Sequence, residues 1–316
     1  MSYSVLTLGD AMITMNPTTI GPLRYVSTFE KKVGGAELNF AIACARLGLH
    51  IKWISRLGKD EFGKFIYNFV RGEGVEMDYV QFVEGYPTSL NFKEIHKDGS
   101  GRTYYYRYQS PIITLTPGDI HPEMFKNIDV VHLTGVYLAI HPQNKLVAQQ
   151  VIHMAKKSGS KISFDPNIRL KLWPIEEARK TFFTLFPYVD LLLTGREEIT
   201  MILENEDETA WGDFARKYNI GELVIKDGGN GSKLYVNNRW YKQKAFPVSV
   251  VDTVGAGDGF DAGYIYASLH GYSYEERLKF ANGVGALATT VSGDNEGLPY
   301  LDEVLAFINQ ERIVER

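Results

Sequence analysis

The sequence has little cysteine, no excess of positive charge and no long apolar run. Its single cysteine, Cys44, excludes an internal disulfide framework and is typical of a reducing compartment. Its 34 lysines and arginines are outnumbered by 38 acidic residues, which argues against nucleic-acid or membrane-surface binding through a basic field. No apolar run approaches the roughly 20 residues of a membrane span, and the start, MSYSVLTLGD, lacks the basic region of a signal peptide. These absences predict a cytoplasmic protein that acts on small molecules, with no nucleic-acid or membrane partner.

Two common phosphate-binding motifs are missing as well. No stretch matches GxxxxGK[ST], so the chain is not expected to be a P-loop kinase. A glycine-rich stretch contains Gly255, Gly257, Gly259 and Gly263, but these do not have the GxGxxG spacing of a dinucleotide-binding fold. Any phosphate chemistry in this chain must therefore use another arrangement.

A regular alternation of short apolar runs and longer amphipathic segments predicts the fold. The 316 residues can form one large α/β domain, or a domain with a smaller partner. The apolar runs predict strands, and the amphipathic segments have a helical period and often end at glycine. The alternation indicates a mostly parallel sheet flanked by helices, with a largely helical C-terminal third from Gly257 onward. The predicted strands are 4–9, 51–58, 130–135, 161–165, 189–194, 222–229 and 232–236, and the predicted helices are 40–48, 62–74, 144–159 and 176–186.

Two segments interrupt this alternation. Residues 12–33 contain two prolines and show no helical period, and residues 88–109 look like two strands joined by the turn KDGSGR. Both are rich in aromatic or β-branched residues and fit poorly into the alternating layer. We expect them to form a small β lid on an α/β core that consists of residues 1–11, 34–87 and 110–316.

The stretch DTVGAGDGFDAG, which begins at Asp252, places several glycines directly before a predicted helix. Backbone N–H groups at the start of a helix lack partners, and the helix dipole adds positive charge there. Because Gly255, Ala256 and Gly257 leave this backbone open to close approach, it suits a phosphate group. Asp258 would face the same place and could take a proton from an attacking hydroxyl. An acidic helix cap is a simpler explanation, but it does not account for the glycines.

DTVGAGD resembles a signature of the ribokinase-like sugar kinases, the phosphofructokinase-B type, which include fructokinases and adenosine kinases. A second signature of that family is similar to VGGAELNFAIACARLG, residues 33–48, followed by RLGKDEFG, residues 56–63. The order and separation of the two signatures match. The resemblance implies a Rossmann-like α/β domain with a β-sheet lid, which transfers the γ-phosphate of ATP to a sugar hydroxyl with Mg²⁺. It leaves a requirement for a monovalent cation open.

The same resemblance implies roles for individual residues. Asp258 would be the catalytic base, and the N–H groups of Gly255, Ala256, Gly257 and Asp258 would form an anion hole. Residues implied to contact sugar hydroxyls are Gly34, Gly35 and Asn39; those implied to bind nucleotide are Asn167, Gly255, Gly257 and, in IKDGGNGS, Lys226, Gly228 and Gly231. A plain hairpin turn would also explain IKDGGNGS. Thr194 to Glu197 resembles an Asn-x-x-Glu element that organises water around magnesium, and only Glu197 carries over because Thr194 replaces the Asn.

Two further stretches concern the acceptor substrate. In TYYYRYQSP, Tyr105 and Arg107 are two residues apart and therefore lie on the same face of a predicted strand. In DPNIRLKLW, Asn167 and Arg169 follow directly after a predicted strand, where α/β sheets bind ligands. An arginine beside a tyrosine hydroxyl suits a carboxylate, because the guanidinium can donate two parallel hydrogen bonds to it. Pairing with surface acids would explain either arginine taken alone.

Together these stretches resemble the 2-keto-3-deoxygluconate kinases. The shared residues are Tyr105-Tyr106-Arg107, Asn167-Ile168-Arg169 with Leu172-Trp173, and Gly293-Asp294-Asn295-Glu296. The resemblance implies that Tyr105, Arg107 and Arg169 hold the carboxylate of a sugar acid and that Asp294 contacts the substrate. Asn91, expected in the same sugar pocket, stands where those kinases have a tyrosine, and Tyr108 to Pro111 depart from their lid sequence.

The sequence therefore predicts an ATP-dependent kinase that phosphorylates the terminal hydroxyl of 2-keto-3-deoxygluconate, or of its galactonate epimer, to the 6-phosphate. Two alternatives keep the enzyme class and change the acceptor, to a neutral ketose such as fructose or to a nucleoside. A third is a catalytically silent sugar-sensing module, which the intact glycines and Asp258 disfavour. A lid edge rich in β-branched and aromatic residues also predicts a homo-oligomer.

Overall fold

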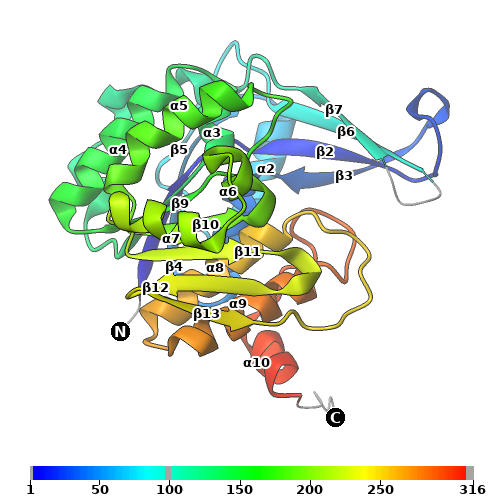
Figure 1. Cartoon of the computed structure of the whole chain (residues 1–316). Helices are drawn as coiled ribbons and strands as arrows, with labels where there is room; N and C mark the ends of the chain where they lie inside the picture. Colours follow the sequence, from blue (N-terminus) through cyan, green and yellow to red (C-terminus); the bar gives the residue numbers. More distant parts are fainter. Residues whose placement is uncertain (1–2, 97–100, 311–316) are drawn as a thin grey trace.

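The computed structural model describes residues 3–96 and 101–310. Within these residues the chain forms a nine-stranded sheet between two layers of helices, and a four-stranded sheet that projects to one side (Figure 1). The turn expected between the two strands of residues 88–109 falls partly on residues 97–100, outside the described residues. The α/β class with a small β lid is therefore confirmed.

The large sheet has the strand order β13-β12-β11-β10-β9-β8-β1-β4-β5. All pairings from β11 to β5 are parallel, and β12 pairs antiparallel with both β11 and β13 at one edge, as expected for a mostly parallel sheet. The sequence did not predict β5 and β13, because these edge strands are partly exposed and lack an apolar run. The strands are β1 (Ser4–Leu8), β4 (His50–Gly58), β5 (Val80–Val83), β8 (Val130–Thr134), β9 (Lys161–Asp165), β10 (Leu191–Gly195), β11 (Glu222–Lys226), β12 (Ser232–Val236) and β13 (Arg239–Gln243).

Successive residues of the central strands pack into two different cores. In β1, Val5 lies in the core on one face of the sheet and Leu6 in the core on the other. In β10, Leu193 lies in the same core as Val5, and Leu192 lies in the same core as Leu6. A strand that is covered on both faces needs apolar residues at every position, which is why these strands appear as continuous apolar runs.

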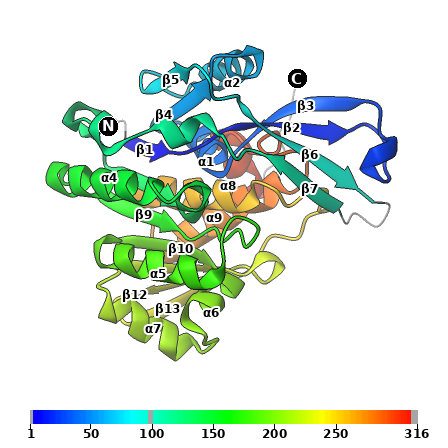
Figure 2. The ribbon, with the colours of Figure 1, turned by 90° about the horizontal axis from the view of Figure 1, so that it is seen from above.

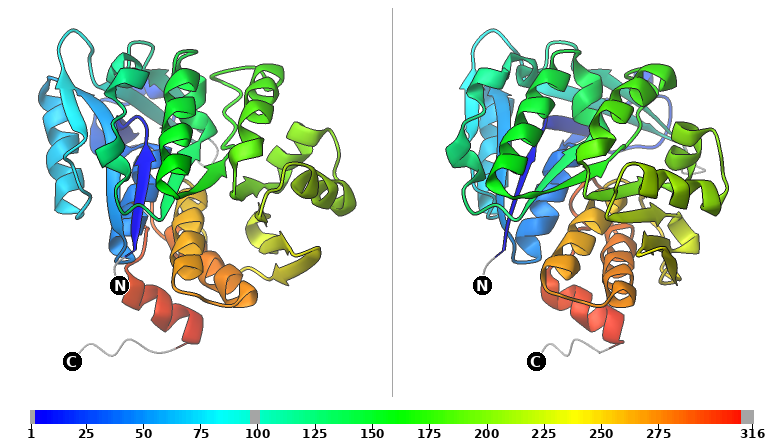
Figure 3. Two further views of the ribbon diagram at one scale, coloured as in Figure 1. Left: turned by 90° about the vertical axis from the view of Figure 1, so that its left-hand side faces the viewer. Right: turned by 60° about the vertical axis from the view of Figure 1, so that its left-hand side comes forward.

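Each face of the large sheet is covered by its own group of helices (Figure 2). One group is α1 (Ala36–Arg46), α2 (Glu61–Gly72), α8 (Ala256–Leu269), α9 (Tyr274–Ala288) and α10 (Leu301–Asn309); the other is α3 (Gly135–Ile140), α4 (Asn144–Ser158), α5 (Ile175–Leu185), α6 (Arg196–Leu203) and α7 (Glu208–Lys217). In the first group, α10 packs against α9 at the outside of the molecule (Figure 3). The largely helical C-terminal third is thus confirmed.

The smaller sheet, called the lid sheet below, has the order β3-β2-β6-β7. Its strands are β2 (Met12–Pro17), β3 (Phe29–Gly34), β6 (Ser89–Ile95) and β7 (Gly101–Tyr106), and apart from Gly34 they come from the two segments that interrupt the alternation. In the β6–β7 pair, Asn91 is opposite Tyr105 and Lys93 is opposite Thr103. These four side chains share one face, since side chains alternate between faces along a strand.

In the part of the chain that the structure describes, none of the helices is both long enough and apolar enough to span a membrane.

Candidate active site

A cleft of about 780 Å³ lies between the lid sheet and the carboxyl ends of the central strands. Ligands of open α/β sheets bind at this end of the strands. The cleft brings together most of the residues that the sequence singled out, from positions far apart in the chain. They are Gly35, Asn39, Asn91, Tyr105, Arg107, Asn167, Arg169, Lys226, Gly255, Gly257, Asp258 and Asp294.

Helix α8 begins at the glycine-rich stretch and directs its N-terminus into the cleft. Gly255 caps the helix with a φ of 77°, a left-handed conformation that favours glycine. A Cβ at Gly255 would also lie 2.0 Å from the backbone oxygen of Asp294, so no other residue fits there without displacing that loop. The fold therefore presents the first N–H groups of α8, and their partial positive charge, to the cleft.

The carboxylate of Asp258 lies in the first turn of α8 and is held by two amides. Asn39 donates from Nδ2 to Oδ2 at 2.8 Å, and Asn167 donates from Nδ2 to Oδ1 at 3.3 Å. Burial raises the pKa of Asp258 to about 7, and the charge of Asp165 adds to this, while the hydrogen bond from Asn39 opposes it. Asp258 is thus an oriented carboxylate whose pKa suits proton transfer near neutral pH.

Asn39 and Asn167 reach Asp258 from opposite sides of the site. Asn39 belongs to α1, which starts at the Gly34-Gly35 pair, and Asn167 follows the end of β9. Asn167 has a φ of 36°, an uncommon left-handed backbone conformation. Its N–H donates to Asp165 Oδ1 at 3.1 Å, which stabilises that conformation and turns the amide towards Asp258.

A buried ion cluster lies beneath the start of α8. Lys226, at the end of β11, donates to Asp165 Oδ2 at 3.0 Å and to Asp261 Oδ1 at 3.0 Å. Asp165 ends β9, and Asp261 lies one turn after Asp258 in α8. Burial raises the pKa of Asp261, whereas Lys226 lowers that of Asp165. The lysine thus joins two strands to the helix that carries the catalytic candidate.

The lid sheet contributes two cations to the cleft, and each pairs with an acid of the core. Arg107 donates to Asp10 Oδ2 at 3.1 Å, and Lys93 donates to Asp294 Oδ1 at 2.7 Å. Arg107 also lies over the ring of Tyr105, with its guanidinium carbon 5.9 Å from the ring centre. All four charged side chains are largely buried, which makes these pairs stronger than surface salt bridges.

Several buried oxygen atoms around the cleft have no hydrogen-bond partner among the described residues. They are Asp10 Oδ1, Glu37 Oε2, Asn39 Oδ1 and Asn91 Oδ1. Glu37 uses its other oxygen to accept from Thr134 and from Tyr137 N, and burial raises its pKa to about 7. A ligand that carries several hydroxyl donors would satisfy these acceptors.

Comparison with known families decides the class of the protein. The family of pfkB carbohydrate kinases matches residues 3–301. The chain belongs to this family. The protein is therefore a carbohydrate kinase, a phosphotransferase with an alcohol group as acceptor, and the ribokinase-like resemblance of its two signatures is confirmed.

Curated relatives include kinases of more than one sugar. The chain is 36% identical to 2-dehydro-3-deoxygluconokinase of Thermoproteus tenax, over 94% of this chain and 91% of the relative. It is 32% identical to 2-dehydro-3-deoxygluconokinase of Bacillus subtilis, over 100% and 98% of the two chains. It is also 32% identical to probable fructokinase-2 of Arabidopsis thaliana, over 96% of this chain and 95% of the relative.

Solved structures share the fold along nearly the whole chain. A PfkB protein from Polaromonas sp. JS666 has a TM-score of 0.88 and 31% identity, over 96% of this chain and 100% of that chain. The 2-dehydro-3-deoxygluconokinase of Thermotoga maritima has a TM-score of 0.89 and 25% identity, over 98% of this chain and 99% of that chain. A fructokinase with bound ATP from Xylella fastidiosa has a TM-score of 0.87 and 25% identity, over 98% of this chain and 99% of that chain.

The structure corrects the prediction for the magnesium element of the kinase. Glu197 is exposed on α6 and does not line the cleft. The next residue, Glu198, does line it and accepts hydrogen bonds from Gly195 N at 2.8 Å and Ile168 N at 2.7 Å. The helical turn of α6 directs Glu198, and not Glu197, towards the cleft.

Four other predicted residues do not line the cleft of the kinase. Gly34 borders Asp294, because a Cβ there would lie 2.2 Å from Asp294 Oδ2. Ala256 belongs to the first turn of α8 without lining the cleft itself. Gly228 and Gly231 are in the β11–β12 turn and, among the described residues, are not part of the cleft wall. Their contact with a nucleotide remains a prediction.

Sequence reasoning missed several charged residues of the site, namely Asp10, Glu37, Lys93, Asp165, Glu198 and Asp261. For Asp10 a signal exists, because it follows the first predicted strand, and ligands bind beyond the carboxyl ends of parallel strands. Asp165 ends another such strand. Lys93 is two residues from Asn91 and therefore on the same strand face.

Replacement of the buried lysine tests the ion cluster. Lys226→Met should destabilise the protein by about 3–5 kcal/mol, because it leaves Asp165 and Asp261 without a counter-charge. Urea unfolding at pH 7 measures the change. The control is Lys59→Met, which removes an exposed lysine paired with Glu84 at 2.5 Å and should cost less than about 1 kcal/mol. Equal losses for the two variants would contradict the stabilising role of the cluster.

Proposed function

We propose that this kinase transfers the γ-phosphate of ATP to the terminal hydroxyl of 2-keto-3-deoxygluconate, or of its galactonate epimer, giving the 6-phosphate. The observation that carries the proposal is that Arg107 and Arg169 line the same cleft as Asp258. The two curated relatives named as 2-dehydro-3-deoxygluconokinases support it. The probable fructokinase among the relatives keeps a neutral ketose as the alternative acceptor, with a nucleoside as a further one.

The proposed reaction is an in-line displacement at the γ-phosphorus. The terminal hydroxyl oxygen of the sugar forms the new bond to phosphorus, while the bond to the oxygen that bridges to the β-phosphate breaks and ADP leaves with the electron pair. Asp258 accepts the hydroxyl proton. The N–H groups at the start of α8 stabilise the negative charge on the transferred group, since they are already oriented towards it.

Selection for a sugar acid is assigned to the arginines of the cleft. Arg169 follows β9 on the same loop as Asn167, and its positive charge lowers the pKa of Asp258. Arg107 comes from the lid, and its Nε is buried without a partner among the described residues. A carboxylate between these two guanidinium groups would complete their hydrogen bonds, with Tyr105 on the same lid face.

The residues present fit a magnesium ion that is held mainly by nucleotide phosphates. Among residues 3–96 and 101–310, no group of three or more His, Cys, Asp or Glu side chains could hold a metal by itself. Magnesium usually keeps several waters and binds through few carboxylates together with substrate phosphates. Glu198, half-buried and lining the cleft, would hold such water. The ion would supply neutralisation of charge on the phosphates.

We further propose that the protein works in the cytoplasm as a homo-oligomer. Cys44 is free and buried, which suits a reducing compartment. On the edge strand β7 of the lid sheet, Tyr104 and Tyr106 are exposed by 39% and 59%, and Tyr108 beyond it is exposed by 85%. Such an edge is suited to pairing with a second copy. A monomer mass in light scattering would contradict the oligomer.

A screen of acceptors tests the proposal directly. Purified protein would be incubated with ATP, Mg²⁺ and, in separate reactions, sugar acids, ketoses and nucleosides, and ADP release would be measured. The highest kcat/KM is expected for 2-keto-3-deoxygluconate or its galactonate epimer. A higher value for fructose or a nucleoside would replace the sugar-acid assignment and leave the kinase class intact.

The role of Asp258 can be tested by a conservative substitution. Asp258→Asn should lower kcat by about 10²–10⁴-fold, because the amide cannot accept the hydroxyl proton. Sugar affinity, measured by calorimetry, should remain close to that of the unmodified protein. Asp302→Asn, the same change in the first turn of α10, is the control and should leave kcat unchanged. Near-normal turnover in Asp258→Asn would remove Asp258 from the mechanism.

The raised pKa of Asp258 predicts a pH dependence of the reaction. Only the ionised carboxylate accepts a proton, so log kcat/KM should be constant above pH 7 and fall by about one unit per pH unit well below it. Initial rates between pH 5 and 9 measure this profile, with thermal melts at each pH to confirm that the protein is folded. A flat profile down to pH 5 would contradict proton transfer to Asp258.

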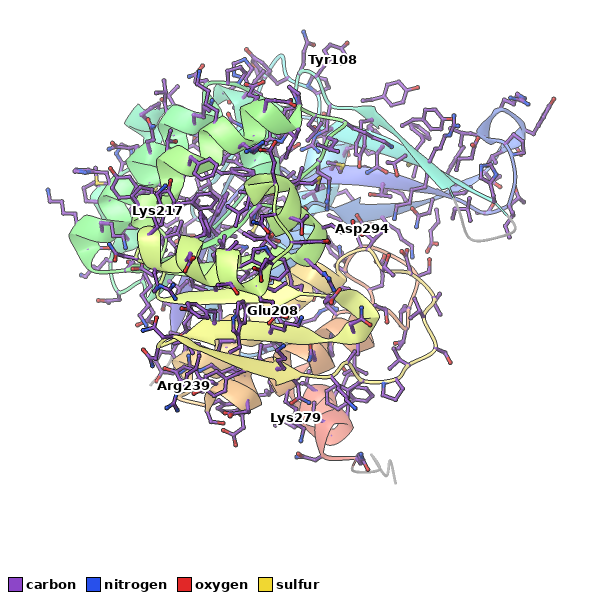
Figure 4. The ribbon with its side chains drawn as sticks, in the orientation of Figure 1. Tyr108, Glu208, Lys217, Arg239, Lys279 and Asp294 are labelled. Atoms are coloured by element: carbon purple, nitrogen blue, oxygen red, sulfur yellow. The ribbon has the colours of Figure 1, made fainter. Side chains whose placement is uncertain are left out.

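The arginines distinguish an acidic from a neutral acceptor. Arg169→Ala should raise KM for the sugar acid by about 10- to 100-fold, because a charge-assisted hydrogen bond is lost. KM for fructose and for ATP should change little. Arg239→Ala is the matched control, since Arg239 is exposed on the edge strand β13, away from Asp294 (Figure 4). An unchanged KM for the acid would exclude Arg169 from carboxylate binding.

A further inference from the structure

The pair of Lys93 and Asp294 joins the lid sheet to the loop after α9 at the edge of the cleft. Lys93 Nζ lies 2.7 Å from Asp294 Oδ1, and the two side chains are exposed by 14% and 11%. Both residues line the cleft. Figure 4 shows Asp294 between the lid sheet and the C-terminal elements of the core. The lysine therefore reaches across from one part of the molecule to the other.

The two oxygen atoms of Asp294 have different surroundings. Oδ1 accepts from Lys93, whereas Oδ2 has no hydrogen-bond donor among the described residues. Oδ2 lies against Gly34, where a Cβ would be 2.2 Å away, so the glycine makes room for it. One oxygen is thus held and the other remains able to accept a hydrogen bond from a ligand in the cleft.

Burial and the charges around Asp294 act on its pKa in opposite directions. Burial raises the pKa of Asp294, Lys93 lowers it, and the nearby acids Glu296 and Asp252 raise it again. Glu296 is itself partly neutralised by Lys32 of β3, at 3.4 Å. Lys93 is therefore the cation that directly compensates the charge of Asp294.

Lys93 also occupies a distinctive place on the lid. It shares its strand face with Asn91, which donates to Thr14 Oγ1 at 3.1 Å and to Met12 Sδ at 2.9 Å and therefore points towards β2. Lys93, two residues further along β6, extends past it to the core loop. The contact between lid and Asp294 thus comes from position 93.

We propose that Lys93 is a positioning residue for the acceptor substrate: it holds Oδ1 of Asp294, so that Oδ2 is left to accept a hydrogen bond from a sugar hydroxyl in the cleft. The inference rests on the proposed kinase reaction but not on the acidic nature of the acceptor, because any hydroxylated sugar could supply the donor. It assigns to the lid a part in sugar selection separate from the arginines.

Kinetics of Lys93→Met test this role. KM for the sugar should rise by about tenfold or more at pH 7, because Asp294 loses the lysine that holds its Oδ1 and no longer presents Oδ2 in a fixed position to the sugar. KM for ATP and kcat at saturating sugar should stay near their original values, and Lys93→Arg should restore most of the affinity.

Lys32→Met is the matched control. Lys32 is also a lid lysine, with a side chain exposed by 12%, and it contacts the same loop through Ser292 O at 3.1 Å and Glu296. It does not line the cleft, so its loss should leave the sugar KM unchanged. Equal increases of KM in both variants would show a general loosening of the lid and would overturn the specific role of Lys93.

A double-mutant cycle separates positioning from direct binding. On an Asp294→Asn background, Lys93→Met should cause little further increase in KM, because the carboxylate that the lysine positions is already gone. An undiminished effect on that background would mean that Lys93 contacts the sugar itself, and an unchanged KM in Lys93→Met alone would overturn the proposal outright. The cycle uses whichever acceptor the screen finds best, so failure of the sugar-acid assignment is observed separately.

Discussion

The buried contact of Lys226 with Asp165 and Asp261 is the interaction on which the rest of the site depends. It ties the ends of β9 and β11 to the first turns of α8. From these elements come Asp258 and one of the two amides that orient it. A lysine surrounded by two buried carboxylates has few alternative partners, so the relative position of these elements is well defined.

A second constraint is the separation of the site between two sheets. The core supplies Asp258, the proposed catalytic base, and the N-terminus of α8, and the lid supplies Lys93 from β6 and Arg107 just after β7. Each lid cation pairs with a core acid, Asp10 or Asp294, so the lid is attached to the core by charge as well as by chain connections. A substrate between them completes hydrogen bonds that protein groups leave open, since Asp10 and Arg107 each keep one buried atom without a partner among the described residues.

The division between core and lid separates two parts of the proposed reaction. Asp258 and the N-terminus of α8, which are proposed to carry the phosphoryl transfer, belong to the core. The face of the lid that lines the cleft carries side chains such as Asn91, Lys93 and Tyr105, which would meet the acceptor sugar. The relatives include kinases named for deoxygluconate and for fructose.

The sequence by itself determined the elements and the motifs of this protein. Continuous apolar runs specified the strands that are covered on both faces, and Gly255 before Asp258 specified a helix start open to an anion. Each of these features follows from residues that are close together in the sequence. Only the tertiary structure decided which charges meet. Lys93 and Asp294 are 201 positions apart, and the choice between Glu197 and Glu198 depends on how α6 is rotated against the core. Such contacts arise from distances in the folded chain, which local periodicity does not contain.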